Sequence, residues 1–315
     1  MSFMKAIGLV TEVLGIISFF QDNLPARSPK GATIRIKVGL EDNSANNYGG
    51  RIAQIMAYDT NNAVIGNLRP NKDIASGDFA DYTIDQETPG IQSRYVSFLG
   101  TNGAICISWI TLKNLDGALD AAWTGDVGSR CGHGWNWGRQ VAGRDAAGNP
   151  YIPRCTWIDA DHSNGLDTGA IKIDFQAYGD QLQDTIKNNA ACSKTIFQSK
   201  ANQVDGIKRS MIEEERPEWM TKRLIVSDFP THNATELCLH PMSFGPDAVG
   251  SDGYFCNMKT RELTPLCTFK DVEGCIDVDQ TNSKISKRSS VAKRSASLHV
   301  RSYEQVDEYR FIEAQ

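Results

Sequence analysis

The alternation of apolar and polar residues along the chain predicts a protein built mainly from β-strands. In the stretch ATIRIKVGLE at residues 32–41, the branched side chains of Ile34, Ile36 and Val38 alternate with polar ones, as in a strand with one buried face. Similar runs follow at short intervals, separated by turn sequences rich in Asn, Pro, Gly and Asp, with no helical pattern between them. This pattern predicts an antiparallel β-sandwich or jelly-roll-like domain over residues 32–180.

Two further expectations concern how the strands pair. Asn102–Gly103 separates the strand-like runs at 94–100 and 104–113, and this dipeptide is a strong hairpin signal because both residues tolerate a positive φ. The runs at 121–128 and 154–161 are expected to be antiparallel neighbours joined by a long glycine-rich loop.

An apolar run opens the chain. It has fifteen residues, 6–20, fewer than the about 18 to 20 that a membrane-spanning helix needs. Lys5 before the run is typical of a signal segment, whereas Glu12 within it and the lack of an A-x-A cleavage site before Pro25 favour a retained helix. Residues 1–24 are therefore predicted to be a signal segment or an apolar helix, and membrane contact through them is a third alternative.

After residue 180 the strand pattern is lost. Residues 181–280 are predicted to form a less regular, mixed and loop-rich region that carries cysteines. Residues 281–315 are basic and rich in serine, with too little apolar surface to offset the entropy of ordering, so they are predicted to be a disordered tail.

Charge and cysteine content narrow the class of protein. The 315 residues carry a formal net charge of -5, so no basic field exists to bind nucleic acid. The eight cysteines are dispersed and form no C-x-x-C pair, which argues against zinc-ribbon and thioredoxin-like sites. We interpret them as disulfides of an oxidising compartment and predict secretion; an intracellular protein with a retained N-terminal helix is the alternative.

Two covalent features follow from this interpretation. Cys131 and Cys155 are predicted to be bridged, because they flank the same glycine-rich loop at the ends of core strands, and Cys106 is the main competitor for either partner. The other pairings stay open. Asn233 lies in the chain's N-x-S/T sequence and is the predicted glycosylation site of a secreted glycoprotein.

The glycine-rich loop holds the first candidate site, in the sequence CGHGWNWG at residues 131–138. Trp135 and Trp137 are two positions apart, so in an extended segment they share a face that would stack on sugar rings, with His133 beside them. The alternative is that both indoles pack over a disulfide at the edge of the sandwich. Trp135, Trp137 and His133 are thus the ligand-binding candidates.

A cluster of carboxylates forms the second candidate site. Asp159, Asp161 and Asp167 are candidate metal ligands, with calcium as the cofactor, because hard cations bind several oxygen atoms. The EF-hand pattern fails, since Gly165 is the seventh and not the sixth residue of the loop and Ala170 stands where a Glu is required. An Asp/Asn turn with side-chain-to-backbone bonds is the structural alternative.

The sequence lacks the common catalytic motifs. The sequence has no HExxH, G-x-S-x-G, P-loop or strand-to-helix G-x-G-x-x-G motif, and we assign no catalytic residue. A metal-dependent enzyme would need His133, Asp159, Asp161 and His162 to meet in space.

Two sequence blocks, C-G-x-x-W at 131–135 and C-x-W-I-D-x-D-H-x-N-G at 155–165, resemble a family of uncharacterised ascomycete fungal proteins. Members are similar over residues 7–178, with an N-terminal apolar helix before the β-domain. The resemblance implies a fungal source and a retained opening helix, and it carries no activity or catalytic residue.

These observations favour a non-enzymatic secreted or surface binding protein, effector-like in kind, whose ligand is a carbohydrate or a host surface. The metal-dependent enzyme and a membrane-active protein acting through residues 1–24 are the alternatives. If the protein binds a ligand, the tryptophan loop is expected to fold back along the sheet, so that it lies with the Asp159–Asp167 loop at one end of the β-domain.

Overall fold

The computed structural model describes most of the chain beyond its opening segment. The described residues are 23–40, 47–115, 120–144, 149–202, 204, 216, 218–240, 243, 245–288 and 298–311. The predicted signal segment or helix at residues 1–24 therefore lies outside the described residues, apart from its last two positions. Within the described part of the chain, no helix is long and apolar enough to cross a membrane.

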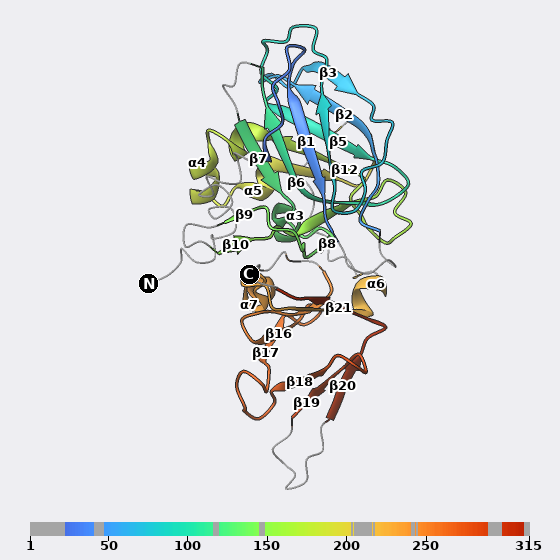
Figure 1. Cartoon of the computed structure of the whole chain (residues 1–315), viewed down its shortest axis with the longest axis vertical. Helices are drawn as coiled ribbons and strands as arrows, with labels where there is room; N and C mark the ends of the chain where they lie inside the picture. Colours follow the sequence, from blue (N-terminus) through green and yellow to red (C-terminus); the bar gives the residue numbers. More distant parts are fainter. Residues whose placement is uncertain are drawn as a thin grey trace. The chain divides into compact units, whose positions relative to one another are not determined.

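The protein is mainly β and folds into two compact units, Met1–Glu213 and Glu214–Gln315 (Figure 1). Unit 1 contains the two antiparallel sheets of the predicted sandwich. The first sheet has the order β4 (Phe79–Thr83), β1 (Thr33–Val38), β6 (Ile105–Lys113), β11 (Cys155–Ile158) and β8 (Trp135–Asn136), with β7 (Asp120–Thr124) also paired to β6. The second has the order β13 (Thr195–Gln198), β12 (Ala170–Asp174), β5 (Tyr95–Gly100), β2 (Ile52–Tyr58) and β3 (Val64–Leu68).

The described helices of unit 1 are short. They are α3 (Asp126–Arg130), the 3-10 helix η1 (Phe175–Tyr178), α4 (Leu182–Lys187) and α5 (Ala191–Lys194), and a small ribbon pairs β9 (Gly143–Arg144) with β10 (Pro150–Tyr151). The boundary predicted at residue 180 is wrong, because β13 pairs with β12 at the edge of the second sheet. The strand alternation is confirmed in β1, where Ile34, Ile36 and Val38 are fully buried.

The hairpin predicted at Asn102–Gly103 does not form. The strand before it, β5, belongs to the second sheet, and the strand after it, β6, belongs to the first. Neither Asn102 nor Gly103 adopts a positive φ. The dipeptide therefore connects the two layers of the sandwich, and the register of the flanking strands is set by other partners.

The strands β7 and β11 are not antiparallel neighbours, which corrects a second prediction. Both pair with the same edge of β6, β7 against Trp109–Lys113 and β11 against Ile105–Ile107. The chain leaves this edge at Gly125 and returns to it at Arg154. A Cβ on Gly125 would lie 2.4 Å from the carbonyl oxygen of Arg154, so the close approach of the two ends requires glycine. We call residues 125–154 the inserted loop.

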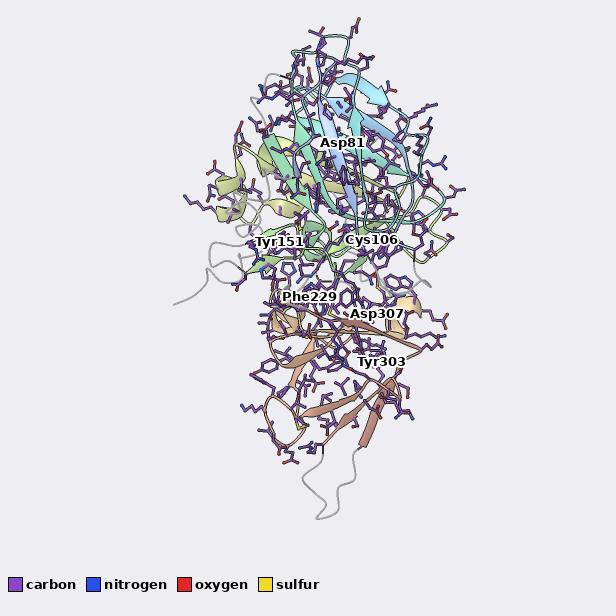
Figure 2. All side chains as sticks on the ribbon, in the orientation of Figure 1. Asp81, Cys106, Tyr151, Phe229, Tyr303 and Asp307 are labelled. Atoms are coloured by element: carbon purple, nitrogen blue, oxygen red, sulfur yellow. A yellow bond between two sulfur atoms is a disulfide. The ribbon has the colours of Figure 1, made fainter. Side chains whose placement is uncertain are left out.

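Four disulfides include all eight cysteines, and their pairing differs from the prediction. Cys131 is bonded to Cys192 of α5, and Cys155 is bonded to Cys106 of β6, whose position is labelled in Figure 2. The predicted Cys131–Cys155 bridge is therefore wrong. Strand register explains the outcome, because β11 lies directly against β6 and brings the Cα atoms of Cys106 and Cys155 to 5.2 Å.

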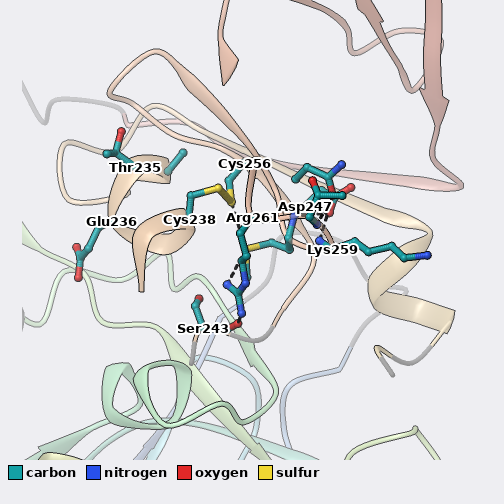
Figure 3. The surroundings of a disulfide bond; sticks show 12 residues. Thr235, Glu236, Cys238, Ser243, Asp247, Cys256, Lys259 and Arg261 are labelled. Atoms are coloured by element: carbon teal, nitrogen blue, oxygen red, sulfur yellow. Dashed lines mark hydrogen bonds between the residues drawn. A yellow bond between two sulfur atoms is a disulfide. The ribbon is translucent and has the colours of Figure 1, made fainter. Parts of the chain in front are cut away.

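Unit 2 is built on a five-stranded mixed sheet. Its order is β17 (Glu262–Pro265), β16 (Tyr254–Asn257), β15 (Asp247–Val249), β14 (Arg223–Ser227) and β21 (Gln305–Tyr309), with β14 parallel to both β15 and β21. A three-stranded sheet follows, of β18 (Ile276–Asp279), β19 (Lys284–Lys287) and β20 (Leu298–Ser302), and the described helices are α6 (Glu218–Thr221) and α7 (Ala234–Leu239). The disulfides Cys238–Cys256, drawn in Figure 3, and Cys267–Cys275 close short loops here.

The disordered tail predicted for residues 281–315 is wrong where the structure describes it. Strands β19, β20 and β21 are all formed, and β21 is parallel to β14 over five residue pairs. Tyr303 and Ile285 are buried in the core of unit 2 with Phe255. The local composition contains too few apolar residues to predict order, but pairing with β14 supplies the partners that the segment lacks by itself.

Candidate functional site

The two candidate tryptophans lie in the interior. The side chains of Trp135 and Trp137 are fully buried, and their ring centroids are 5.9 Å apart. Asn136 between them pairs with Cys155, next to the Cys106–Cys155 disulfide. Stacking of sugar rings on an exposed indole pair is therefore excluded, and both indoles pack inside the unit, as the structural alternative requires.

A buried polar group holds the inserted loop in place. The Asp126 carboxylate accepts hydrogen bonds from the Tyr151 hydroxyl and the Arg154 backbone N–H, and the Arg154 guanidinium lies 3.5 Å from it. Burial, followed by the charge of Asp126, raises the pKa of Tyr151 well above its ordinary value, so this hydroxyl stays protonated. Arg154 also donates to the Ser129 hydroxyl at 3.2 Å. These contacts join the start of the inserted loop at Asp126 to its end at Tyr151 and Arg154.

His133 connects the inserted loop to the loop at residues 159–168, which carries Asp159 and Asp161. Its ring is buried, stacks on Phe197 with centroids 3.7 Å apart, and forms a 2.7 Å hydrogen bond through Nδ1 with the Thr168 hydroxyl. Thr168 in turn accepts a backbone bond from Asp159 at 2.7 Å. The two loops thus meet, as predicted, but they meet through buried packing and not through an exposed surface shared by tryptophans and aspartates.

We call residues 159–168 the aspartate loop. It follows β11 directly, and positive φ values at His162 and Gly165 turn it back toward β12. Asp159 is fully buried, and its Oδ2 accepts from the backbone N–H and the side-chain amide of Asn164, at 3.3 and 3.1 Å. The predicted side-chain-to-backbone bonding of an Asp/Asn turn is confirmed here and at Asp161, whose Oδ1 accepts from the Ser163 N–H at 3.1 Å.

The second carboxylate oxygen of Asp159 has no hydrogen-bond donor. Its Oδ1 is buried without a partner, and the carboxyl of Asp161 lies beside it. Burial raises the pKa of Asp159, bonds from Asn164 oppose that change, and the neighbouring Asp161 carboxyl raises the pKa further. The Ser163 N–H lowers the pKa of Asp161. One buried and one exposed carboxyl therefore face each other, and no donor other than a proton held by one of the two lies between them.

The remaining sequence candidates do not join this pair. Asp167 is exposed, and the described residues contain no group of three or more His, Cys, Asp or Glu side chains placed to hold a metal ion. His162 bonds to the Leu166 carbonyl through Nδ1 at 2.6 Å and to the Ser199 hydroxyl through Nε2 at 3.3 Å. The cluster of His133, Asp159, Asp161 and His162 that the enzyme alternative needs is not assembled.

Two other loops border the aspartate loop, and sequence reasoning missed both. The Thr101 carbonyl accepts from the Ala160 N–H at 2.9 Å, and the Gln198 carbonyl accepts from Gly169 at 2.8 Å. We call residues 100–104, 159–169 and 198–202 the polar loop end of unit 1. Its exposed residues are almost all polar: Asn102, Gly103, Asp161, Ser163, Asn164, Gly165, Asp167, Ser199, Lys200 and Asn202. The turn composition of each loop was visible in the sequence, but their adjacency was not.

The glycosylation candidate Asn233 caps α7. Its Oδ1 accepts from the Glu236 N–H at 3.0 Å, and the side chain is half-buried. Thr235 of the same motif donates its hydroxyl to Asp252. Glycosylation at Asn233 stays a prediction.

Comparisons with known proteins give no family. No family model and no curated protein matches the chain. Solved structures of three variants of a protein named LOX are similar to 30%, 41% and 41% of this chain, at 12%, 8% and 10% identity and TM-scores of 0.24, 0.24 and 0.22. The chain covers 14%, 16% and 17% of those structures. Similarity this low assigns neither fold nor function.

Proposed function

We propose that the protein is an extracellular, non-enzymatic binding protein that uses the polar loop end of unit 1 to bind carbohydrate through a calcium ion held by Asp159 and Asp161. The observation that carries this proposal is the buried Asp159 Oδ1, which faces a second carboxyl and receives no bond from an N–H or hydroxyl group. The proposal replaces the tryptophan pair as the ligand contact, because both indoles are buried.

A cation is the natural partner for this pair. Two facing carboxylates repel each other unless a proton or a cation lies between them. A buried acceptor without a donor costs about 1–3 kcal/mol, and more if it is charged, so a cation that satisfies Asp159 Oδ1 also removes that cost. The exposed position of Asp161 leaves one side of the pair open to water molecules, which complete a coordination shell.

The donors favour calcium over zinc. Both proposed protein ligands are carboxylates, and oxygen is the ligand that calcium prefers, whereas zinc is typically held by sulfur and nitrogen. The nearby His133 and His162 rings already bond to Thr168, Leu166 and Ser199. The eight cysteines are all in disulfides and offer no thiolate.

Carbohydrate is the ligand class that fits the surroundings. A calcium ion that keeps water ligands on its open side can exchange them for neighbouring hydroxyls of a sugar. Side chains such as Ser163, Asn164 and Asn202 surround the pair and are suited to bond other hydroxyls. Four disulfides agree with an oxidising environment, and this supports secretion.

Calorimetry on chelated protein tests the cation. We expect one calcium ion to bind per chain, with an affinity at least about tenfold lower for Asp161→Asn, the loss of one charged ligand. Asp167→Asn is the matched control, because it removes an exposed carboxylate of the same loop that is not one of the two proposed ligands. Equal affinity of wild type and Asp161→Asn would exclude the site.

A glycan panel probed with and without chelator tests the ligand. Binding that disappears on chelation and in Asp161→Asn supports the full proposal. If calcium binds but no glycan does, the cation site is supported and carbohydrate is excluded as the ligand class. If glycan binding is unchanged by the chelator, the cation takes no part in recognising the glycan.

A further inference from the structure

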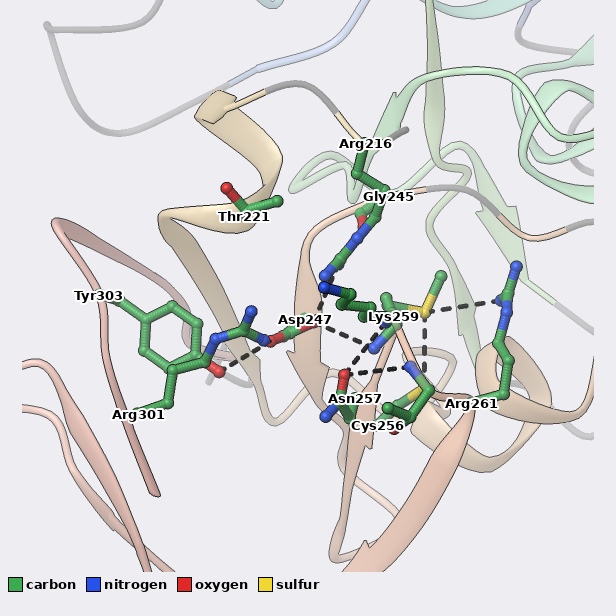
Figure 4. Close-up of polar contacts among 12 residues, drawn as sticks. Arg216, Thr221, Gly245, Asp247, Cys256, Asn257, Lys259, Arg261, Arg301 and Tyr303 are labelled. Atoms are coloured by element: carbon green, nitrogen blue, oxygen red, sulfur yellow. Dashed lines mark hydrogen bonds and ion pairs between the residues drawn. The ribbon is translucent and has the colours of Figure 1, made fainter. Parts of the chain in front are cut away.

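Several arginines gather around one buried carboxylate in unit 2 (Figure 4). Asp247 of β15 is fully buried. Its Oδ1 accepts from Arg216 Nη1 at 2.9 Å and from the Met258 backbone N–H at 3.0 Å. Its Oδ2 accepts from the Tyr303 hydroxyl at 2.9 Å and from Arg301 Nη1. The four acceptor positions of this carboxylate are therefore occupied.

A third arginine lies close to this group. Arg261 donates through Nη2 to the Ser243 carbonyl, while Arg216 donates through Nη1 to the Gly245 carbonyl at 3.1 Å. The two carbonyls are two residues apart in the chain, a span of at most about 7 Å. Burial and then the charge of Arg216 lower the pKa of Arg261, so the two guanidinium groups repel each other.

Two buried polar groups at the same place have no partner. The Nη2 of Arg216, whose side chain is 8% exposed, makes no hydrogen bond. The hydroxyl of Ser243, a residue that is 2% exposed, makes none either. Buried donors are almost always satisfied in folded proteins, and an unsatisfied one indicates a missing acceptor. Figure 3 shows the Ser243 side chain beside the guanidinium end of Arg261.

We propose that unit 2 holds a small tetrahedral oxyanion, phosphate or sulfate, bound by Arg216 Nη2, the Ser243 hydroxyl and the guanidinium of Arg261. Every group of the set is a hydrogen-bond donor, and Arg216 Nη2 and the Ser243 hydroxyl are the two that lack an acceptor. Planar guanidinium groups bond oxyanions in the paired geometry that favours phosphate and sulfate over halides. Burial of Arg216 and Ser243 limits the ligand to a small ion. The site is independent of the proposed function, which concerns unit 1 alone.

Thermal unfolding and calorimetry with inorganic phosphate, sulfate and chloride at matched ionic strength test the site. We expect saturable stabilisation by phosphate or sulfate and none by chloride. Arg261→Gln should weaken binding by about tenfold or more and Ser243→Ala by a few-fold, as for the loss of charged and neutral hydrogen bonds. Lys259→Gln is the matched control, because it removes one exposed positive charge near the site without touching the proposed donors.

The outcomes separate a built site from general charge screening. Equal stabilisation by chloride, or an effect of Lys259→Gln as large as that of Arg261→Gln, overturns the proposal. Should Arg261→Gln fail to fold, Ser243→Ala decides, since it removes a single oxygen atom. The acidic residues 213–215 lie outside the described residues and offer a carboxylate as an alternative occupant. If phosphate binds only when these three are changed to Gln, the chain fills the site itself and the proposal is wrong.

Discussion

The two units reach stability by different means. Of the ten largest fully buried side chains among the described residues, only Tyr309 belongs to unit 2, and the others belong to unit 1. The disulfides of unit 1 join residues 49 and 61 positions apart, whereas those of unit 2 join residues 18 and 8 positions apart. A small unit buries a smaller share of its surface and needs other supports. In unit 2 these are short disulfide loops and the ion pairs around Asp247.

The buried carboxylates of the two units illustrate the difference. Asp126 in unit 1 binds Tyr151 and Arg154 of the inserted loop and Thr124, which directly precedes that loop. Asp247 in unit 2 binds Arg216, which precedes α6, and Arg301 of β20, so it joins distant parts of its unit. The buried Asp126 therefore stabilises one loop of unit 1, whereas the buried Asp247 connects segments of unit 2 that are far apart in the chain.

The largest effect is expected for Asp247→Ala. The change leaves two arginines and a tyrosine hydroxyl without their acceptor, and breaking a buried pair from one side costs about 3–5 kcal/mol. Unit 2 should lose hydrogen-exchange protection throughout β14, β15 and β21, with unit 1 unchanged. Hydrogen exchange followed by mass spectrometry measures both units in one sample.

Asp126→Ala is the matched change in unit 1. It should lower the hydrogen-exchange protection of amides in the inserted loop, while the amides of β1 and β5 stay protected. Loss of protection across the whole sandwich would show that Asp126 is as central to its unit as Asp247, and the contrast between the units would fail.

Disulfide removal should cost more in unit 1 than in unit 2. Chain-entropy estimates give about 4 kcal/mol for the Cys131–Cys192 bond and about 2.5 kcal/mol for Cys267–Cys275, because a longer closed loop restricts the unfolded chain more. Denaturant titration of the two Cys→Ser double variants, each on its own, measures the free energy of unfolding. Equal or reversed losses would mean that native-state strain or packing dominates over loop length.

The ionisation of Asp159 should make the free energy of unfolding depend on pH. Its pKa is raised above the ordinary 3.8 by burial and then by Asp161, so the folded state holds this proton more tightly than the unfolded state. The stability it contributes is complete below the unfolded pKa and is lost as pH rises through the folded value. In chelator, the unfolding free energy of wild type relative to Asp159→Asn should therefore fall as pH rises above 3.8.

Calcium should reverse that trend, because a bound cation favours the charged carboxylate. The comparison is made by denaturant titration across pH with chelator and with calcium. A relative stability that is flat with pH in chelator would mean that neither burial nor Asp161 raises the pKa of Asp159. Unit 2 provides the internal reference, since the Asp159–Asp161 pair belongs to unit 1.

The smallest effect is expected at the surface of unit 2. Arg288 pairs with Asp271 at 2.6 Å, and both side chains are exposed. Such pairs contribute about 0–1 kcal/mol. Asp271→Asn should therefore change the unfolding free energy by less than about 1 kcal/mol, and raised salt should erase the difference. A loss near that of Asp247→Ala would contradict the view that burial, not the number of ion pairs, decides stability here.

The sequence by itself determined the strand pattern at the start of unit 1, the presence of disulfides and one carboxylate turn, whereas it missed the strands that follow residue 180. Branched residues at every second position predicted β1 correctly, because side-chain alternation is a local property of the extended chain. An even set of dispersed cysteines predicted disulfides. The spacing of Asp159 and Asp161 with Asn164 and Gly165 predicted a carboxylate turn, since all its hydrogen bonds are formed within a few residues.

Only the tertiary structure decided which partners meet. Asn102–Gly103 has hairpin chemistry, yet its flanking strands found longer-range partners in different sheets. The spacing of Trp135 and Trp137 fits an exposed face equally well, and their burial depends on where the inserted loop folds back against β11. The C-terminal segment forms strands only because β14 and β19 pair with it. Each of these outcomes rests on contacts between residues far apart in the chain, to which a local pattern of side chains is insensitive.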